Sequence, residues 1–297
     1  MDEKSRVALL SVGSNTCLTL GKLTVGLMMG SVSVISEAVH SGLDLVAAII
    51  AFIAVKMAAK PADERHNYGH GKFENLAGII EAMLILVAGI MIIYHAVPKL
   101  KGDVAIESLG LGVAVMGVSA LVNLLVARKL LNTAKKTDSP ALAADGWHLM
   151  TDVYTSLGVF VGLGAIHLTG LTILDPIIAI LVALLIIKTA FKLIWDSVCN
   201  ILDTRLPIAE ERLIEEVLSK YAGEYLDYHA LRTRKAGSDR YVDLHLVVPK
   251  YQNINEVHNL CDRIEDELKR QLPNVQTLIH TEPCAGHCEE IWRLIKD

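Results

Sequence analysis

Six long apolar stretches constrain this sequence more than any other feature. They run at about 7–29, 31–55, 76–97, 106–126, 141–168 and 174–198. Each is close to the roughly 20 residues that a helix needs to cross the hydrocarbon core of a bilayer. The first stretch lacks a short apolar core followed by a small-residue cleavage site, so we interpret it as a retained helix. We therefore predict an α-helical membrane domain of six transmembrane helices over residues 1–204.

The distribution of charge predicts a second domain and excludes several classes of protein. Residues 1–199 hold 15 basic and 15 acidic side chains, whereas residues 200–297 hold 13 and 18, so the net charge of −5 comes from the last third. A chain with this apolar first part and no basic excess is neither an ordinary soluble enzyme nor a nucleic-acid binder. We predict a polar cytosolic domain over residues 205–297.

The last third has the periodicities of a small α+β domain. Helical patterns cover 208–221 and 253–271, and strand patterns cover 229–235, 241–248 and 275–282. In 241–248, Val242, Leu244, Leu246 and Val248 alternate with Tyr241, Asp243 and His245. The order αββαβ predicts a ferredoxin-like domain, with a three-stranded sheet covered on one face by two helices.

Basic residues predict the orientation of the chain in the membrane. Ten lie on the side of the chain ends: Lys4, Arg6, Lys56, Lys60, Arg65, Lys72, Arg128, Lys129, Lys135 and Lys136. The opposite side has three, which are Lys22, Lys99 and Lys101. Because cytoplasmic loops carry the excess of Lys and Arg, we predict a plasma (inner) membrane protein with both termini in the cytosol.

Two pairs of ionisable residues lie within the apolar stretches. His40 and Asp44 are four residues apart in the second stretch, and His148 and Asp152 have the same spacing in the fifth. The spacing places each pair on one helical face. Two imidazoles and two carboxylates that converge form the tetrahedral set that zinc favours. The alternative is a pair of hydrogen bonds that join two helices, but ionisable side chains in mid-membrane are costly and usually functional.

Neighbouring residues add to this hypothesis. The small residues Ser41, Gly42, Gly146 and Ser156 would let the second and fifth helices approach closely. Asn15, Glu37 and Glu81 are further polar residues in the stretches, for which a structural and a pathway role are equally open. Imidazole and carboxylate groups also bind protons, so a metal ion and protons would compete for the same atoms.

At these residues the sequence resembles the cation diffusion facilitator family, and within it the bacterial zinc/proton antiporters of the ferrous-iron-efflux type. The resemblance rests on six apolar stretches, two H-x-x-x-D motifs, the loop segment at 63–72 and the αββαβ tail. It implies a homodimer with a cytosolic metal-binding domain. It also implies that His40, Asp44, His148 and Asp152 form the transport site, with His at position 40 typical of the zinc and cadmium branch.

The resemblance implies two further metal sites. Asp63, His66 and His70 have ligand-like spacing in a cytosolic loop, and the alternative is a polar loop with two solvated histidines. In the tail, the family's binuclear zinc site falls on His229, His245, His258, His280 and Glu282. Glu282 stands where the family often has Asp, and the alternative is a set of scattered surface histidines. Cys284, His287 and Cys288 could bind a soft metal or stay a reduced tail.

The expected function is export of zinc, with cadmium as a second candidate, out of the cytosol in exchange for protons as the counter-substrate. The expected partners are the metal ion, the lipid bilayer and a second copy of the chain, and not nucleic acid. One alternative is manganese or iron efflux on the same scaffold, and another is a membrane metal sensor that transports nothing. A membrane metalloenzyme is disfavoured, because no H-E-x-x-H motif occurs and the intramembrane set already holds four ligands.

Overall fold

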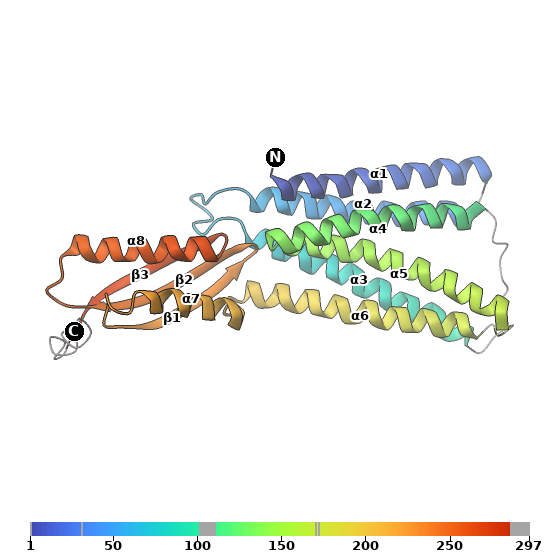
Figure 1. The fold of residues 1–297 in the computed structure, drawn as a ribbon. Coiled ribbons are helices and arrows are strands. Elements are labelled where there is room, and N and C mark those ends of the chain that lie inside the picture. The colour runs from blue at the N-terminus through green and yellow to red at the C-terminus, as the bar shows by residue number, and fades with distance from the viewer. Residues whose placement is uncertain (1, 31, 101–110, 170, 172, 286–297) are drawn as a thin grey trace. The chain divides into compact units, whose positions relative to one another are not determined.

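The computed structural model describes the chain except for residues 1, 31, 101–110, 170, 172 and 286–297 (Figure 1). It divides into two compact units, Met1–Val198 and Cys199–Asp297, which we describe one at a time. The expected domain boundary between residues 204 and 205 stays a prediction.

The described residues of the first unit form six long helices, as the apolar stretches predict. Their bounds are α1 (Glu3–Met29), α2 (Val32–Ala58), α3 (Lys72–Lys99), α4 (Leu111–Thr137), α5 (Pro140–Thr169) and α6 (Leu174–Ile201), the last of which ends just inside the second unit. A helix of this length is about 40 Å long at 1.5 Å per residue, which is enough to span a bilayer.

The fourth helix extends well beyond the predicted stretch. It continues to Thr137, so Arg128, Lys129, Lys135 and Lys136 belong to the helix and not to a loop. Basic side chains near a helix C-terminus are favourable because the helix dipole is negative there. The chain then turns at Asp138, where φ is 55°, and Ser139 caps α5 by accepting a hydrogen bond at 3.3 Å from the backbone N–H of Leu142.

The first unit has the burial pattern of a membrane protein, with polar groups inside and apolar groups outside. Large apolar side chains on its outer faces are exposed, among them Leu20, Leu125 and Leu181. Asn15, Glu81 and many other polar residues are buried. By length and composition, the described parts of α2, α3, α4 and α6 qualify as membrane spans. Buried ionisable residues lie on α2 and α5, and α1 carries the buried Lys22.

Close helix contacts differ in part from the expectation for the small residues. A Cβ added at Gly146 would lie 2.8 Å from Cγ of Leu131, so this glycine allows close packing of α5 against α4 and not against α2. Gly42 on α2 faces Thr19 of α1 at 4.0 Å. Gly146 therefore sets the approach of α5 to α4, whereas the contact of Gly42 with Thr19 is an ordinary van der Waals contact.

The second unit has the αββαβ order that the sequence predicts. Its elements are α7 (Ile208–Lys220), β1 (Asp227–Ala236), β2 (Asp239–Val248), α8 (Ile254–Gln271) and β3 (Val275–Pro283). The sheet has the order β1-β2-β3, in which β1 and β2 are antiparallel and β2 and β3 are parallel. A tight turn at Gly237, with φ 61°, joins the first two strands.

The core of the second unit lies between one face of the sheet and both helices. Val242, Leu244, Leu246 and Val248 are buried there with Ile214, Val217 and Leu218 of α7 and with Val257, Leu260, Ile264 and Leu268 of α8. Because side chains alternate along a strand, His245 lies on the opposite face. Tyr241 also lies on that face but is buried, since the guanidinium of Arg234 stacks 4.2 Å from its ring.

Candidate metal sites

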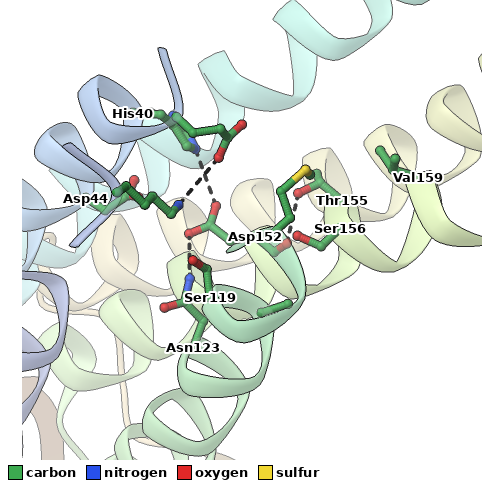
Figure 2. A pocket seen from close by; sticks show the side chains of 12 residues that line it. His40, Asp44, Ser119, Asn123, Asp152, Thr155, Ser156 and Val159 are labelled. Atoms are coloured by element: carbon green, nitrogen blue, oxygen red, sulfur yellow. Dashed lines mark hydrogen bonds and ion pairs between the residues drawn. The ribbon is translucent and has the colours of Figure 1, made fainter. Parts of the chain in front are cut away.

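The two intramembrane His-Asp pairs come together between α2 and α5, and they pair crosswise. Nε2 of His40 on α2 lies 3.7 Å from Oδ1 of Asp152 on α5. Nε2 of His148 on α5 lies 3.1 Å from Oδ1 of Asp44 on α2. Ligand atoms of His40, Asp44 and Asp152 all lie within 4.8 Å of one another, and this close group does not include His148, which contacts Asp44. We call all four residues the intramembrane cluster. Figure 2 shows His40 and Asp152 pointing toward each other.

The cluster borders a cavity of about 190 Å³ (Figure 2). Its lining comes from four helices and comprises Lys22, Glu37, His40, Asp44, Met116, Ser119, Ala120, Asn123, Asp152, Thr155, Ser156 and Val159. The side chain of His40 is 51% exposed, whereas that of Asp44 is 4% exposed. The cavity thus reaches the cluster from one side and ends at Asp44.

The opposite side of the cluster is packed with apolar side chains. Val55, Ala127, Leu130, Leu142 and Leu149 are fully buried there in one apolar core. These residues lie toward the ends of α2, α4 and α5 that are near the loop 61–71, whereas the cavity lies toward the other ends. Among the described residues, the cavity therefore reaches the cluster from the side away from the loop 61–71.

The structure adds residues to the cluster that sequence reasoning missed. Nδ2 of Asn123 on α4 donates a hydrogen bond at 3.4 Å to Oδ2 of Asp152, the carboxylate that also faces His40. Lys22 lies within α1 and in the cavity wall, and not in a loop as the charge count assumed. A polar residue in an apolar stretch was the available signal for both, but the sequence alone does not reveal which helix they face.

Asn15, Glu37 and Glu81, whose roles the sequence leaves open, have different surroundings. Glu37 lines the cavity and pairs with Lys22 at 3.4 Å. Asn15 is buried, and its Nδ2 lies 3.5 Å from Oγ of Ser11. Glu81 on α3 is fully buried, and no hydrogen bond from a described residue reaches either carboxylate oxygen. Asp145 on α5, which sequence reasoning did not single out, is buried in the same way.

The loop residues Asp63, His66 and His70 also come together. Asp63 lies between the two imidazoles, with Oδ1 3.2 Å from Nδ1 of His66 and Oδ2 3.4 Å from Nε2 of His70. The backbone N–H of His66 donates to Asp63 at 2.7 Å, and this hydrogen bond lowers the pKa of that carboxyl group. The turn therefore holds an ionised carboxylate beside two imidazoles, a set of three that could hold a metal ion.

The strand register assembles the tail residues. His229 on β1 is opposite His245 on β2, which is opposite His280 on β3. Glu282 bridges the strands, with Oε1 2.7 Å from Nδ1 of His245 and Oε2 3.2 Å from Nε2 of His229. His280 is adjacent, with Nε2 3.8 Å from Oε1 of Glu282. Desolvation opposes ionisation of Glu282, but the hydrogen bonds with His245 and His229 prevail and lower its pKa.

The remaining tail candidates lie apart from this close group or outside the described residues. His258 is on α8, where its exposed ring lies 3.6 Å from Asp262 one turn away. The group of ligand atoms within 4.8 Å of one another comprises His229, His245 and Glu282 and does not include it. Cys284 is disulfide-bonded, so the expectation of a metal ligand or a reduced thiol there is wrong, and His287 and Cys288 lie outside the described residues. Glu282, whose side chain is one methylene longer than that of Asp, therefore contacts two histidines of the sheet, and no residue of α8 belongs to this close group.

Comparisons with known proteins cover both units. The family model of the cation efflux transmembrane domain matches residues 8–202, and that of the cation efflux protein cytoplasmic domain matches residues 206–284. An uncharacterized transporter of Synechocystis sp. is 35% identical, covering 93% of this chain and 89% of the relative. The cation-efflux pump FieF of Serratia proteamaculans is 30% identical over 94% and 92% of the two chains. A zinc-form structure of CzrB, a proposed zinc transporter, is 38% identical over 27% of this chain and 92% of that one, with a TM-score of 0.26.

Proposed function

Because this chain belongs to the cation efflux family, also called the cation diffusion facilitators, we propose that it exports zinc from the cytosol in exchange for protons. It is a multi-pass protein of the cell membrane and a cation efflux transporter. The finer proposal concerns the ion, the counter-ion and the direction. Cadmium is the second candidate ion, because it shares the ligand preferences of zinc.

The observation that carries this proposal is the crosswise pairing of His40 with Asp152 and of His148 with Asp44. Two imidazoles and two carboxylates suit zinc, whereas manganese and other hard ions prefer oxygen ligands. Two carboxylates balance the charge of a divalent ion, so the loaded cluster is neutral in the membrane. When the ion leaves, protons can take its place on the same groups.

The one-sided cavity supports alternating access. With the termini in the cytosol, as the basic residues predict, the cavity faces outward and the apolar plug around Leu142 and Leu149 closes the cytosolic side. A transporter of this kind needs a second conformation in which the plug opens and the cavity closes. The loop cluster around Asp63 lies at the cytosolic ends of α2 and α3, where it could receive the incoming ion.

The tail cluster supports a regulatory role and a homodimer. Metal on His229, His245, His280 and Glu282 would change the charge and rigidity of the cytosolic domain, and we propose that it draws two copies of the domain together. His258 lies outside the close group of His229, His245 and Glu282, so it would ligate the same ion only if the side chains rearranged. A sensor that transports nothing would keep this site but would have no use for the intramembrane cluster.

Flux measurements on reconstituted vesicles test the proposal. The full chain is reconstituted with a pH dye inside, and zinc, cadmium and manganese are added in turn. We expect zinc and cadmium to drive proton movement of opposite direction, and Asp152→Ala to abolish it. Asp196→Ala, which removes an exposed carboxylate from α6 outside the cavity, is the matched control. Zinc flux that survives Asp152→Ala would refute the site, and flux of manganese alone would favour the alternative cargo.

A further inference from the structure

Lys22 is a basic side chain buried in the wall of the cavity. Its side chain is 8% exposed. Nζ donates a hydrogen bond at 2.8 Å to Oγ of Ser41 and lies 3.4 Å from Oε2 of Glu37. Ser41 follows His40 directly in α2, so the ammonium group is fixed within one helical turn of both His40 and Asp44.

Placing a charged amine inside a membrane domain is costly, and it needs a partner. Glu37 is a partner on the same cavity wall, and the hydroxyl of Ser41 satisfies a second donor position. Neither contact is needed to join α1 to α2, because the two helices pack along much of their length. For instance, Gly26 of α1 lies so close to Ile35 of α2 that an added Cβ would be 2.9 Å from it. The position of the charge therefore needs another explanation.

The charges around the cavity supply that explanation. Among the described lining residues, Glu37, Asp44 and Asp152 are acidic and Lys22 is the one amine. Asp44 and Asp152 match a divalent ion, so Glu37 alone would add a third negative charge. Lys22 cancels this third charge. In a partly desolvated cavity such charges act over several ångströms and are little screened by salt.

We propose that Lys22 sets the metal affinity of the cavity: its fixed positive charge, held by Ser41 and Glu37, keeps binding weak enough for the ion to leave outward. The inference rests on the proposed function only for the direction of release. It makes Lys22 an affinity-determining residue that acts through its charge and does not ligate the ion. A merely structural Lys22 would affect folding but not the balance between affinity and turnover.

The test uses charge variants of the full chain in which the other two clusters have been removed by Asp63→Ala and Glu282→Ala. Zinc affinity is measured in detergent by competition with a fluorescent chelator, and zinc flux is measured in vesicles. We expect Lys22→Met to bind zinc about tenfold more tightly. The same variant should have a lower KM and a lower maximal flux, because release becomes slow. Lys22→Arg keeps the charge and should remain close to the parent.

The double variant Lys22→Met with Glu37→Gln is the decisive control. It removes both members of the pair and restores the net charge of the cavity, so we expect its zinc affinity to return to within about threefold of the parent. A structural role would instead make the double variant as impaired as the single one. An unchanged or weaker affinity in Lys22→Met, or a double variant that binds as tightly as the single one, would overturn the inference.

A second variant keeps the test decisive if Lys22→Met does not fold. Glu37→Gln leaves the ammonium without its counter-charge, and we expect it to weaken zinc binding by about tenfold. No change in affinity would overturn the inference. Failure of the parent chain to transport zinc would refute the proposed function, whereas the order of affinities among the variants would still decide the role of Lys22.

Discussion

Two glutamates on one face of α3 have opposite surroundings. Glu74 and Glu81 are seven residues apart, and both are fully buried. Glu74 accepts from Nζ of Lys4 at 2.7 Å and from the hydroxyl of Ser139, so its charge is compensated. No hydrogen bond from a described residue reaches the carboxylate of Glu81. An uncompensated carboxylate in such a site destabilises the fold, unless it binds a proton or another cation.

Replacing Glu74 or Glu81 by glutamine should therefore change the stability of the fold in different ways. We expect Glu74→Gln to reduce the free energy of unfolding by about 1–3 kcal/mol, because the partly buried amine of Lys4 loses its counter-charge. Glu81→Gln removes a charge that no hydrogen bond from a described residue compensates, and it should leave stability unchanged or raise it. Thermal unfolding in detergent, followed by circular dichroism, measures both. An equal loss of stability in the two variants would contradict this account.

For single residues, the sequence predicts which side chains can bind a metal ion better than it predicts which residues contact each other across helices. The i, i+4 spacing places His40 with Asp44 and His148 with Asp152 on one face, because helix geometry alone decides it. The crosswise pairing depends on the relative height of α2 and α5, which packing sets. Asn123 and Lys22 were missed for the same reason, since the partner of a polar residue on another helix cannot be inferred from its own segment.

Among the helices, the approach of α5 to α4 depends on one missing side chain. A Cβ at Gly146 would lie 2.8 Å from Cγ and 2.9 Å from Cδ2 of Leu131, and 3.2 Å from Cβ of Leu130. Leu130 is fully buried and has little room to move. His148 follows Gly146 by two residues, so a shift of α5 at this point would also move a member of the intramembrane cluster.

We therefore expect Gly146→Ala to lower both stability and zinc flux. The overpacking should cost about 1–3 kcal/mol, measured by thermal unfolding, and the flux should decrease severalfold. Gly13→Ala on α1 is the matched control, because an added Cβ there meets nothing within 4 Å. It should be neutral or stabilising by up to about 1 kcal/mol, since alanine has the higher helix propensity. Equal behaviour of the two variants would contradict the packing argument.

The strands of the tail were more predictable than the ends of the helices. Alternation in 241–248 predicts which residues enter the core, and the structure buries Val242, Leu244, Leu246 and Val248 as expected. The register that aligns His229, His245 and His280 was not predictable, because it depends on a tight hairpin and on a parallel pairing after α8. The apolar pattern did not predict the end of α4, because the last turns of this helix consist largely of polar residues.

The aligned histidines lead to a prediction for the tail sheet. Zinc that binds the folded sheet and not the unfolded chain should stabilise the second unit, by about 2.7 kcal/mol at one hundred times the dissociation constant. Hydrogen–deuterium exchange of β1, β2 and β3 in the full chain should therefore slow when zinc is added. Glu282→Ala should remove the effect, because this carboxylate contacts both His229 and His245.

His258→Ala is the matched control for this measurement. His258 is exposed on α8 and lies outside the close group of ligand atoms, so the zinc effect should persist in this variant. Protection by zinc that is lost in His258→Ala but kept in Glu282→Ala would show that the ion binds elsewhere in the tail.

Over the whole molecule, the ligands of each cluster come from a single unit of the chain. His40, Asp44, His148 and Asp152 lie in the first unit, and the close tail group lies entirely in the second. The structure places basic residues of both counts in helices, since Lys22 lies in α1 and Arg128, Lys129, Lys135 and Lys136 lie in α4, and the orientation of the chain stays a prediction. The clusters that we propose for transport and for regulation are thus separate in sequence.

This separation predicts graded effects on flux. His245→Ala or His280→Ala should reduce zinc flux severalfold without abolishing it, because the intramembrane cluster and its cavity remain complete. Asp44→Ala should abolish flux, since it removes a carboxylate from the proposed transport site and leaves His148 without its partner at 3.1 Å. Initial rates in vesicles over a range of zinc concentrations distinguish the two classes. Complete loss of flux in either histidine variant would make the tail part of the transport path and would reject a purely regulatory role.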